Sequence, residues 1–463
     1  MAGVLHEANI AGRPGPSVQE VLSRETRSVP AALRQEVNDS LGTEDLDAKR
    51  YYAPEFYRLE VERMWNRVWQ MACRVEEIPR VGDHIIYEVG DYSLIVVRSR
   101  PNEIKAFHNA CLHRGRILRE TGGHVSSFTC KFHGFTWRLD GTLSFVPGRW
   151  DFPQIKDEEF CLPEAKVGVW GGFVFVNLDP NAMSLEDYLS DIPAHFQTWD
   201  FEHHYKAMHI GKIIPRVNWK VAIEAFLEAL HIPVTHPQIM PSCGDLNSQY
   251  DLRQDQPHQS RLLFLMGMSS PVLGKRVTEQ EILDSMKIQL GTSPEDAQLP
   301  PSMTARTYAA ELMRKRMARL TNGKDFSNVS DSEILDGIVY FQFPNFFIWG
   351  GYANLVYRFR PWANEPEQAL MEIIVLPPAP KDAPMPPPAP MHLLGPDETF
   401  ADAKELGDLG PFFNQDLGNM EWVQKGLRAT RKPGVTLARY QESQIRHFHR
   451  TLDMYVYGEN GRR

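Results

Sequence analysis

Two short segments each combine a cysteine with a histidine, and together they could hold iron. They read Cys111-Leu112-His113-Arg114-Gly115 and Cys130-Lys131-Phe132-His133-Gly134. Each offers one thiolate and one imidazole, next to a glycine that permits a tight loop. In one type of two-iron, two-sulfide cluster, two cysteines hold one iron and two histidines hold the other. The spacing therefore predicts that Cys111, His113, Cys130 and His133 bind a [2Fe-2S] cluster.

A tetrahedral zinc site could use the same four ligands. Zinc modules more often pair cysteine with cysteine and histidine with histidine, whereas each segment here supplies one ligand of each kind. The spacing thus favours the iron–sulfur cluster over zinc.

A second group of metal-binding side chains lies about a hundred residues further on. The stretch from Trp219 to His231 has a helical pattern, so Glu228 and His231 are expected on one helix face. Pro233 is expected to end or kink this helix and to swing His236 back toward the same point. Two histidines and one carboxylate around an open coordination sphere bind iron(II) in non-haem oxygenases. We therefore expect His231 and His236 to bind a mononuclear iron, with a carboxylate supplied from elsewhere in the chain.

The elements that must position these side chains change character along the chain. Polar residues 1–45 predict a loosely packed N-terminal arm with one short helix. Residues 46–180 alternate short β-rich runs with turns, including a hairpin signal at Asp140-Gly141, and predict a small antiparallel β domain. Residues 181–463 mix both patterns and predict a larger domain whose antiparallel sheet is flanked by helices. The expected fold class is α+β.

The larger domain should contain several distinct elements. The pattern predicts helices within 276–320, a stiff proline-rich connector at 377–390, a C-terminal helix at 437–454, and strands at 207–214, 338–343, 346–349, 355–359 and 370–376.

Bulk composition excludes several other classes of protein. The formal net charge of −9 gives no electrostatic footprint for nucleic acid, and no apolar run is long enough to span a membrane. The first residues show no secretory signal, so a cytoplasmic location is expected. In the cytoplasm the five cysteines should remain reduced, and their odd number is consistent with a chain without disulfides.

Residues from about 50 to 450 resemble the alpha (oxygenase) subunit of Rieske non-haem iron ring-hydroxylating oxygenases. The likeness rests on Asn109 to Gly115, on Cys130 to Trp137, on Asn218 to His236 and on Phe343-Pro344-Asn345-Phe346. Respiratory Rieske proteins carry an extra cysteine in each loop, where this chain has Arg116 and Phe132. The resemblance therefore implies the lower-potential kind of cluster that passes electrons to oxygen chemistry.

The resemblance also supplies the missing carboxylate. The segment from Asn414 to Leu427 is similar to the family segment that bears the distal ligand, which implies that Asp416 is the third iron ligand. Asp408 and Glu421 are the competing carboxylates. The family usually has Asp where this chain has Glu228, although some members that act on quaternary ammonium compounds share the glutamate. It also usually has Asn in place of Ala225 and Tyr in place of Leu230.

The resemblance further implies a catalytic role for Glu228. In such oxygenases three subunits form a ring, and an acidic side chain bridges a histidine of the cluster in one subunit and a histidine of the iron in the next. Glu228 would therefore link His231 to His113 or His133 of a neighbour. The implied assembly is a homotrimer, or an α3β3 complex with a small subunit, and its electrons come from NAD(P)H through a separate reductase, with or without a ferredoxin.

The expected reaction is mono- or cis-dihydroxylation, with O2, of an aromatic or other hydrophobic ring compound. An N- or O-demethylating or quaternary-ammonium Rieske monooxygenase is the alternative, and Glu228 tilts toward it. A pure electron-transfer Rieske protein is a further rival, which His231, His236 and Asp416 oppose. The substrate pocket is expected to include Phe226, Leu227, Leu230, Phe343 and Phe347. Arg216 and Lys220 are the basic residues near the ligands that could meet an acidic substrate.

Overall fold

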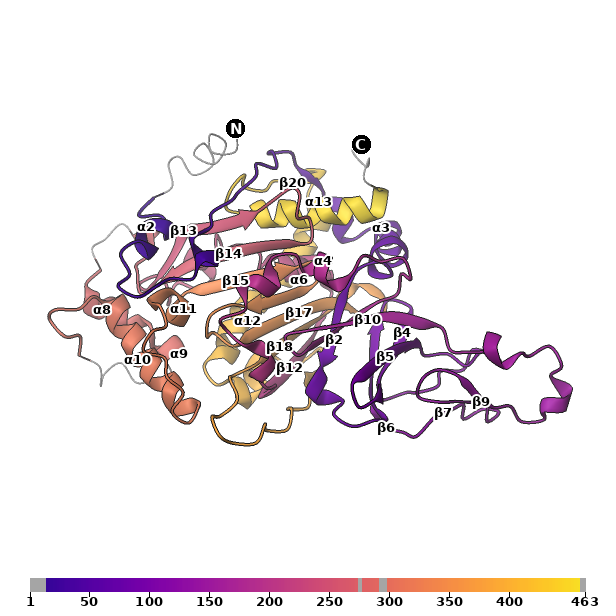
Figure 1. Cartoon of the computed structure of the whole chain (residues 1–463). Helices are drawn as coiled ribbons and strands as arrows, with labels where there is room; N and C mark the ends of the chain where they lie inside the picture. The colour runs from indigo at the N-terminus through magenta and orange to yellow at the C-terminus, as the bar shows by residue number, and fades with distance from the viewer. Residues whose placement is uncertain (1–13, 274–276, 291–297, 459–463) are drawn as a thin grey trace. The chain divides into compact units, whose positions relative to one another are not determined.

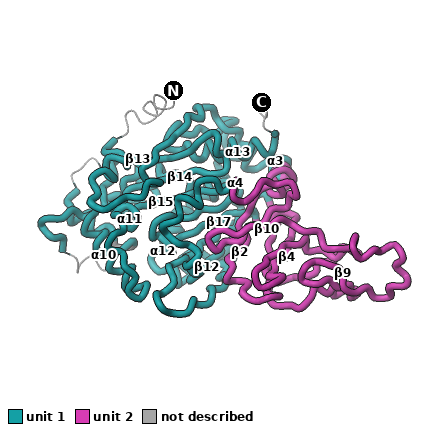
Figure 2. Tube along the Cα trace, in the orientation of Figure 1, with its two compact units in different colours: residues 1–57, 189–361, 366–463 teal, residues 58–188, 362–365 magenta. Residues whose placement is uncertain are grey.

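The computed structural model describes residues 14–273, 277–290 and 298–458, and the chain divides into two compact units. The smaller unit comprises residues 58–188 and 362–365 (Figure 2). The larger unit comprises residues 1–57, 189–361 and 366–463. Two short helices, α3 (Pro54–Glu60) and α4 (Leu185–Leu189), lie where the chain passes from one unit to the other.

The smaller unit contains two β-sheets. The first has seven strands in the order β2-β11-β10-β5-β4-β3-β6, and the second has three in the order β7-β8-β9. Their bounds are β2 (Gln70–Arg74), β3 (Asp83–Val89), β4 (Tyr92–Arg100), β5 (Glu103–His108), β6 (Gly123–His124), β7 (Phe128–Thr129), β8 (Thr136–Trp137), β9 (Leu143–Phe145), β10 (Glu164–Trp170) and β11 (Phe173–Asn177).

The predicted antiparallel β domain and its hairpin are confirmed. Strands β8 and β9 pair antiparallel across the Asp140-Gly141 turn. Gly141 has φ +86°, a left-handed conformation that glycine adopts without a steric penalty. The hydrophobic core of this unit includes Cys111 and Cys130 beside Phe135 and Trp137. The side chains of the two cysteines are therefore packed in the core of this unit.

The larger unit is built on one eight-stranded sheet in the order β13-β14-β15-β16-β17-β18-β12-β19 (Figure 1). Antiparallel pairings run from β13 to β17, and β12 pairs antiparallel with β18 and parallel with β19. The bounds are β12 (Met208–Pro215), β13 (Cys243–Leu252), β14 (Gln259–Met266), β15 (Gly337–Gln342), β16 (Phe346–Trp349), β17 (Leu355–Trp362), β18 (Glu365–Val375) and β19 (His392–Leu394). A separate two-stranded sheet joins β1 (Leu46–Asp47) to β20 (Gly434–Val435).

Helices surround this sheet. They are α2 (Val18–Leu22), α5 (Ile192–His195), α6 (Trp219–Glu224), α7 (Ile232–Thr235), α8 (Glu279–Ser285), α9 (Lys287–Leu290), α10 (Ala305–Leu320), α11 (Asp331–Leu335), α12 (Leu409–Ala429) and α13 (Ser443–Tyr457). Helices α8, α9 and α10 gather at one end of the unit, at the left of Figure 1. Within the described parts of the chain, no helix is both long and apolar enough to cross a lipid bilayer.

The α+β architecture is confirmed, and the structure corrects three local expectations. The first concerns the N-terminal arm. Residues 1–13 lie outside the described residues, but the arm beyond them is not loosely packed, because Leu22 and Leu33 are fully buried. Glu25 also forms an ion pair with Arg306 of α10 at 2.9 Å.

The second correction concerns the predicted helix from Trp219 to His231. Helix α6 ends at Glu224, and turns carry the chain from there to His231. Pro233 does not end a helix but lies in the first turn of α7, where the missing backbone N–H removes no helical hydrogen bond. The third correction is minor, since the C-terminal helix begins at Ser443 rather than at Leu437.

Candidate metal centres

The two cysteine–histidine loops of the smaller unit have the same backbone structure. In the first, the N–H of Gly115 donates to the carbonyl of Cys111 at 2.9 Å, and in the second, Gly134 donates to Cys130 at 2.9 Å. Both glycines have positive φ, +75° and +79°, which the tight turn requires. The two turns therefore close in the same way, although His113 follows its cysteine by two residues and His133 by three.

The side chains of these loops form an inner pair and an outer pair. Cys111 and Cys130 are buried, and their thiols share a hydrogen bond. The His113 and His133 rings lie closer to the surface, with centroids 4.7 Å apart. One thiol pair and one imidazole pair are the two halves of a cluster with two cysteine and two histidine ligands.

The surroundings of these side chains fit a bound cluster. Burial raises the pKa of the Cys130 thiol, but the backbone N–H groups of Phe132 and His133, the Cys111 thiol and the charge of Arg116 together outweigh that effect, and the net shift is downward. Such N–H groups stabilise a thiolate ligand. Nδ1 of His113 is buried and has no hydrogen-bond partner among the described residues, which suits a nitrogen that binds a metal.

The spread of the four ligands also bears on the zinc alternative. Among the described residues, the only group of at least three ligand atoms within 4.8 Å of one another lies elsewhere in the chain. The four side chains of the loops are therefore spaced more widely than the shell of a single tetrahedral ion.

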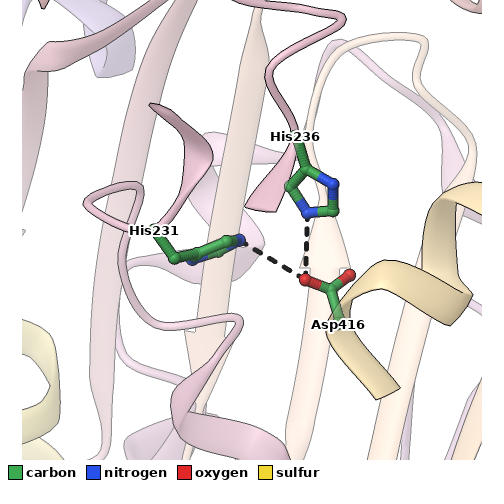
Figure 3. A group of neighbouring side chains, drawn as sticks. All are labelled: His231, His236 and Asp416. Carbon is green, nitrogen blue, oxygen red and sulfur yellow. Dashed lines mark hydrogen bonds and ion pairs between the residues drawn. The ribbon is translucent and has the colours of Figure 1, made fainter. Parts of the chain in front are cut away.

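That compact group is His231, His236 and Asp416, in the larger unit. All three side chains point toward one another (Figure 3). Oδ1 of Asp416 lies 2.9 Å from Nε2 of His236 and 3.5 Å from Nε2 of His231. The histidines flank α7, and Asp416 comes from α12. Two imidazoles and one carboxylate form the donor set of non-haem iron(II) oxygenases, so the site fits a mononuclear iron.

Neighbouring side chains fix how each histidine ring is turned. His231 Nδ1 lies 2.6 Å from Oε1 of Glu228, and His236 Nδ1 lies 2.7 Å from Oε1 of Gln415. When the Nδ1–H group donates a hydrogen bond to these oxygens, Nε2 is unprotonated and its lone pair can bind a metal. The ring of Phe412 stacks on His236 with centroids 4.1 Å apart. Gln415 and Phe412 were not singled out in the sequence, although both lie within four residues of Asp416.

Glu228 contacts His231 through a turn rather than along a helix face. Its Oε2 accepts hydrogen bonds from the backbone N–H groups of Leu230 and His231. Burial lowers the pKa of His231, but the carboxylates of Glu228 and Asp416 together outweigh burial, and the net shift is upward.

The competing carboxylates and the basic candidates lie away from the three ligands. Asp408 is the residue before α12, and Glu421 pairs with the exposed Arg216 at 2.6 Å. Lys220 is buried near the rings of Phe56 and Trp219.

A cavity of about 480 Å³ reaches all three candidate metal ligands. This volume is within the range of small-molecule sites. Phe226 lines the cavity, whereas Leu227, Phe343 and Phe347 are buried outside its wall, and Leu230 is exposed. The wall is mostly apolar and aromatic, which the sequence predicted only through Phe226.

Tyr357, which was not predicted, is a polar group in this aromatic wall. Its side chain is buried, and its hydroxyl forms no hydrogen bond with the described residues. Burial and the nearby Asp416 carboxylate both raise the pKa of the phenol. The hydroxyl is therefore neutral and available as a hydrogen-bond donor.

Comparison with known proteins finds two family matches, one around each candidate metal site. The family described as the Rieske [2Fe-2S] domain matches residues 68–156, and the family described as the ring hydroxylating alpha subunit (catalytic domain) matches residues 196–458.

Similar curated proteins include the glycine betaine monooxygenase oxygenase subunit of Chromohalobacter salexigens, 30% identical over 48% of this chain and 51% of that protein. The biphenyl 2,3-dioxygenase subunit alpha of Rhodococcus jostii is 30% identical over 50% of this chain and 52% of that protein. The chain thus matches about half the length of these curated relatives.

Two solved structures share the fold over most of the chain. Naphthalene 1,2-dioxygenase from Rhodococcus sp. has a TM-score of 0.60 and 20% identity, covering 90% of this chain and 95% of that one. The apo form of the quaternary ammonium Rieske monooxygenase CntA has a TM-score of 0.61 and 17% identity, covering 90% and 96%. Since the alpha-subunit family matches more than half of the 463 residues, the chain belongs to the Rieske non-haem iron ring-hydroxylating oxygenases, as an alpha subunit.

Proposed function

We propose that this chain is the terminal oxygenase component that hydroxylates a hydrophobic ring compound with O2, using electrons from NAD(P)H delivered by a separate reductase, with or without a ferredoxin. The observation that carries the proposal is the cavity of about 480 Å³ that opens directly onto His231, His236 and Asp416. When bound, the [2Fe-2S] cluster supplies single electrons, and the mononuclear iron activates O2.

The residues of the chain contribute position and a dry environment. Phe226 and Phe412 place apolar surface beside the metal-binding side chains, so a ring compound would bind there by displacing water. Glu228 and Gln415 hold the two imidazoles, so that both Nε2 atoms face Asp416. Tyr357 offers one hydrogen-bond donor to a substrate or to a water in the cavity.

We assign Glu228 a second role, as the link between subunits in a trimer. Its Oε2 accepts from backbone amides, whereas Oε1 accepts, among the described residues, only from His231 and keeps one acceptor position. That position is suited to a cluster histidine, His113 or His133, of a neighbouring subunit. The homotrimer and the α3β3 assembly both remain consistent with this role.

A quaternary-ammonium or demethylating monooxygenase is the second candidate. Glycine betaine monooxygenase subunits are among the relatives, and Trp349 and Tyr357 lie at 83° to each other with centroids 6.0 Å apart in the cavity wall. Perpendicular aromatic rings can enclose a cation.

The test is NADH-dependent oxygen uptake by the reconstituted enzyme with a surrogate reductase and a substrate panel. The panel contains aromatic and polycyclic compounds, methyl ethers and trimethylammonium compounds. Product formation from ring compounds supports the first candidate, and release of formaldehyde or trimethylamine supports the second. The matched controls are His231→Ala, which should abolish product, and His392→Ala, which removes a half-exposed histidine paired with Glu405. Product from His231→Ala would contradict both candidates.

A further inference from the structure

Arg316 stands out in the wall of the iron-site cavity because most of its neighbours are apolar. It belongs to α10, which also contributes Met313, Met317 and Leu320 to the wall. The metal-binding side chains come from other elements, the turns around α7 and helix α12. In Figure 1, α10 lies at the outer end of the unit, whereas α12 lies beside the sheet. A ligand that fills the cavity therefore meets the metal ligands on one wall and Arg316 on another.

The guanidinium of Arg316 is only partly used by the protein. Its Nη1 donates to the backbone carbonyls of Gln289 and Leu290 at 3.1 and 2.7 Å. Its Nε and Nη2 have no acceptor among the described residues. Nε and Nη2 project their N–H groups in parallel on one edge of the guanidinium, which is the geometry that a carboxylate accepts in bidentate fashion.

The charge of Arg316 is also uncompensated, unlike that of two other arginines on the same helix. Arg306 pairs with Asp336 at 2.6 Å and with Glu25 at 2.9 Å. Arg314 pairs with Asp331 and Glu311. In the described part of the chain, no carboxylate lies within 4.0 Å of Arg316. Asp336, an acidic residue of the same cavity wall, already pairs with Arg306.

The positive charge of Arg316 is energetically unfavourable in these partly buried surroundings. Burial lowers the pKa of Arg316, and the positive charge of Arg319 lowers it further. A partly buried cation without a counter-ion gains more from an anionic ligand than an exposed one does, because water screens it less. The same charge opposes a quaternary ammonium ligand in the same cavity.

We propose that Arg316 binds the carboxylate of an amphipathic substrate whose ring system extends through the apolar cavity toward His231, His236 and Asp416. The inference rests on the proposed oxygenase function and narrows its substrate class to hydrophobic ring carboxylic acids. Arg316 is a specificity-determining residue in this assignment, and it takes no part in the chemistry at the metal. Arg216 and Lys220, the basic residues suggested by the sequence, do not line the cavity.

The test measures binding to the holoenzyme by calorimetry, without reductase and without O2. The probes are 4-(1-naphthyl)butanoate and 1-naphthylacetate, each compared with its neutral primary amide. We expect each carboxylate to bind the wild-type enzyme about 10-fold or more tightly than its amide, as a charge-assisted bidentate contact implies. Arg316→Gln should bring this ratio close to one and leave the affinity for the amides within about 2-fold, because the glutamine can still donate to the α9 carbonyls.

Two further variants complete the test. Arg319→Gln removes an exposed positive charge from the same helix and should keep the preference for carboxylates. Arg316→Lys keeps the charge without the planar fork, so its preference should be intermediate, and it serves if Arg316→Gln does not fold. A carboxylate preference that persists in Arg316→Gln, or one that Arg319→Gln removes to the same extent, overturns the proposal. Failure of both carboxylates to bind the wild-type enzyme also overturns it.

The binding assay separates this inference from the proposed function. If carboxylates bind through Arg316 but no ring compound is oxidised by the reconstituted enzyme, the oxygenase proposal fails and the binding site stands. If neutral ring compounds are oxidised while Arg316→Gln changes no binding ratio, the oxygenase proposal stands and the role of Arg316 fails.

Discussion

Nε2 of His236 lies 2.9 Å from Oδ1 of Asp416, although the two residues are 180 positions apart in the chain. Both side chains are nearly inaccessible to water, with exposures of 3% and 5%. Burying a carboxylate beside an imidazole costs free energy unless the pair has a partner such as a hydrogen bond or a metal. This geometry leads to the first of four predictions.

Asp416→Ala should remove the mononuclear iron and leave the cluster in place. The total iron per chain should fall from about three to about two, because the cluster ligands lie in a different unit. Iron analysis together with the visible spectrum of the cluster measures this. Glu421→Ala, on the same helix, is the matched control and should keep all the iron, since Glu421 pairs only with the exposed Arg216. Full iron content in Asp416→Ala would exclude Asp416 as a ligand.

Glu228→Gln should leave both metal sites loaded and slow the transfer of electrons to the iron site. The amide oxygen can still accept a hydrogen bond from Nδ1 of His231, but the variant loses the charge and both bonds that the backbone N–H groups of Leu230 and His231 make to Oε2. We expect the reduced cluster to be reoxidised by O2 and substrate about 10-fold or more slowly, as for loss of an orienting partner of a metal ligand. Stopped-flow absorbance reports that rate. Reoxidation at the wild-type rate would refute the linking role.

Tyr357→Phe should change the chemistry without changing stability. The hydroxyl of Tyr357 forms no hydrogen bond with the described residues, so the free energy of unfolding should stay within about 0.5 kcal/mol. The share of consumed O2 that appears as product should fall, because the cavity loses a hydrogen-bond donor. Oxygen uptake and product are measured together.

Tyr250→Phe is the contrasting variant for that experiment. Tyr250 accepts from the N–H of Ala229 at 3.0 Å and donates to Gln441 at 3.1 Å. Loss of these buried bonds should lower the free energy of unfolding by about 1–3 kcal/mol. Equal loss of stability in both variants would show that the Tyr357 hydroxyl has a structural partner.

Stability should fall as the pH drops below about 6.5, and His447 should contribute to this fall. Burial lowers the pKa of His447 from 6.5 to about 4. Between these two values the unfolded chain binds a proton that the folded chain does not, so the free energy of unfolding rises with pH across this window and is lost as the pH falls through it.

Urea unfolding between pH 5 and pH 7 tests this contribution. His447→Gln can still donate to the carbonyl of Arg253, which lies 3.2 Å from Nε2 of His447. The variant should reduce the slope of the free energy of unfolding against pH by the amount that corresponds to about one bound proton. An unchanged slope would mean that His447 does not have the lowered pKa.

The local sequence is sufficient to predict the four candidate ligands of the cluster. Cys111, His113, Cys130 and His133 lie on two short loops, and each loop is closed by a hydrogen bond from its own glycine. A turn of this kind depends on residues within a few positions of one another, so the spacing of cysteine, histidine and glycine is enough to predict each turn. The same holds for the hairpin at Asp140-Gly141 and for most strands of the larger unit.

The sequence was less informative where the backbone could choose between helix and turn. The pattern from Trp219 to His231 predicts one helix, but the chain leaves the helix after Glu224. In the structure, the Glu228 carboxylate binds the backbone N–H groups of Leu230 and His231, a local arrangement that competes with helical hydrogen bonds. The contact between Glu228 and His231 was thus predicted correctly for a reason that the structure does not support.

The sequence alone was enough to predict the candidate metal ligands, the order of the two domains and membership of the oxygenase family. The surroundings of the candidate iron ligands became clear from the folded chain, because they come from segments far apart in the sequence. Folding brings Gln415 to His236 and Tyr357 to the cavity, and it leaves Arg316 without a carboxylate partner among the described residues. Such relationships follow from how the sheet and helices pack, and no spacing of residues along the chain specifies them.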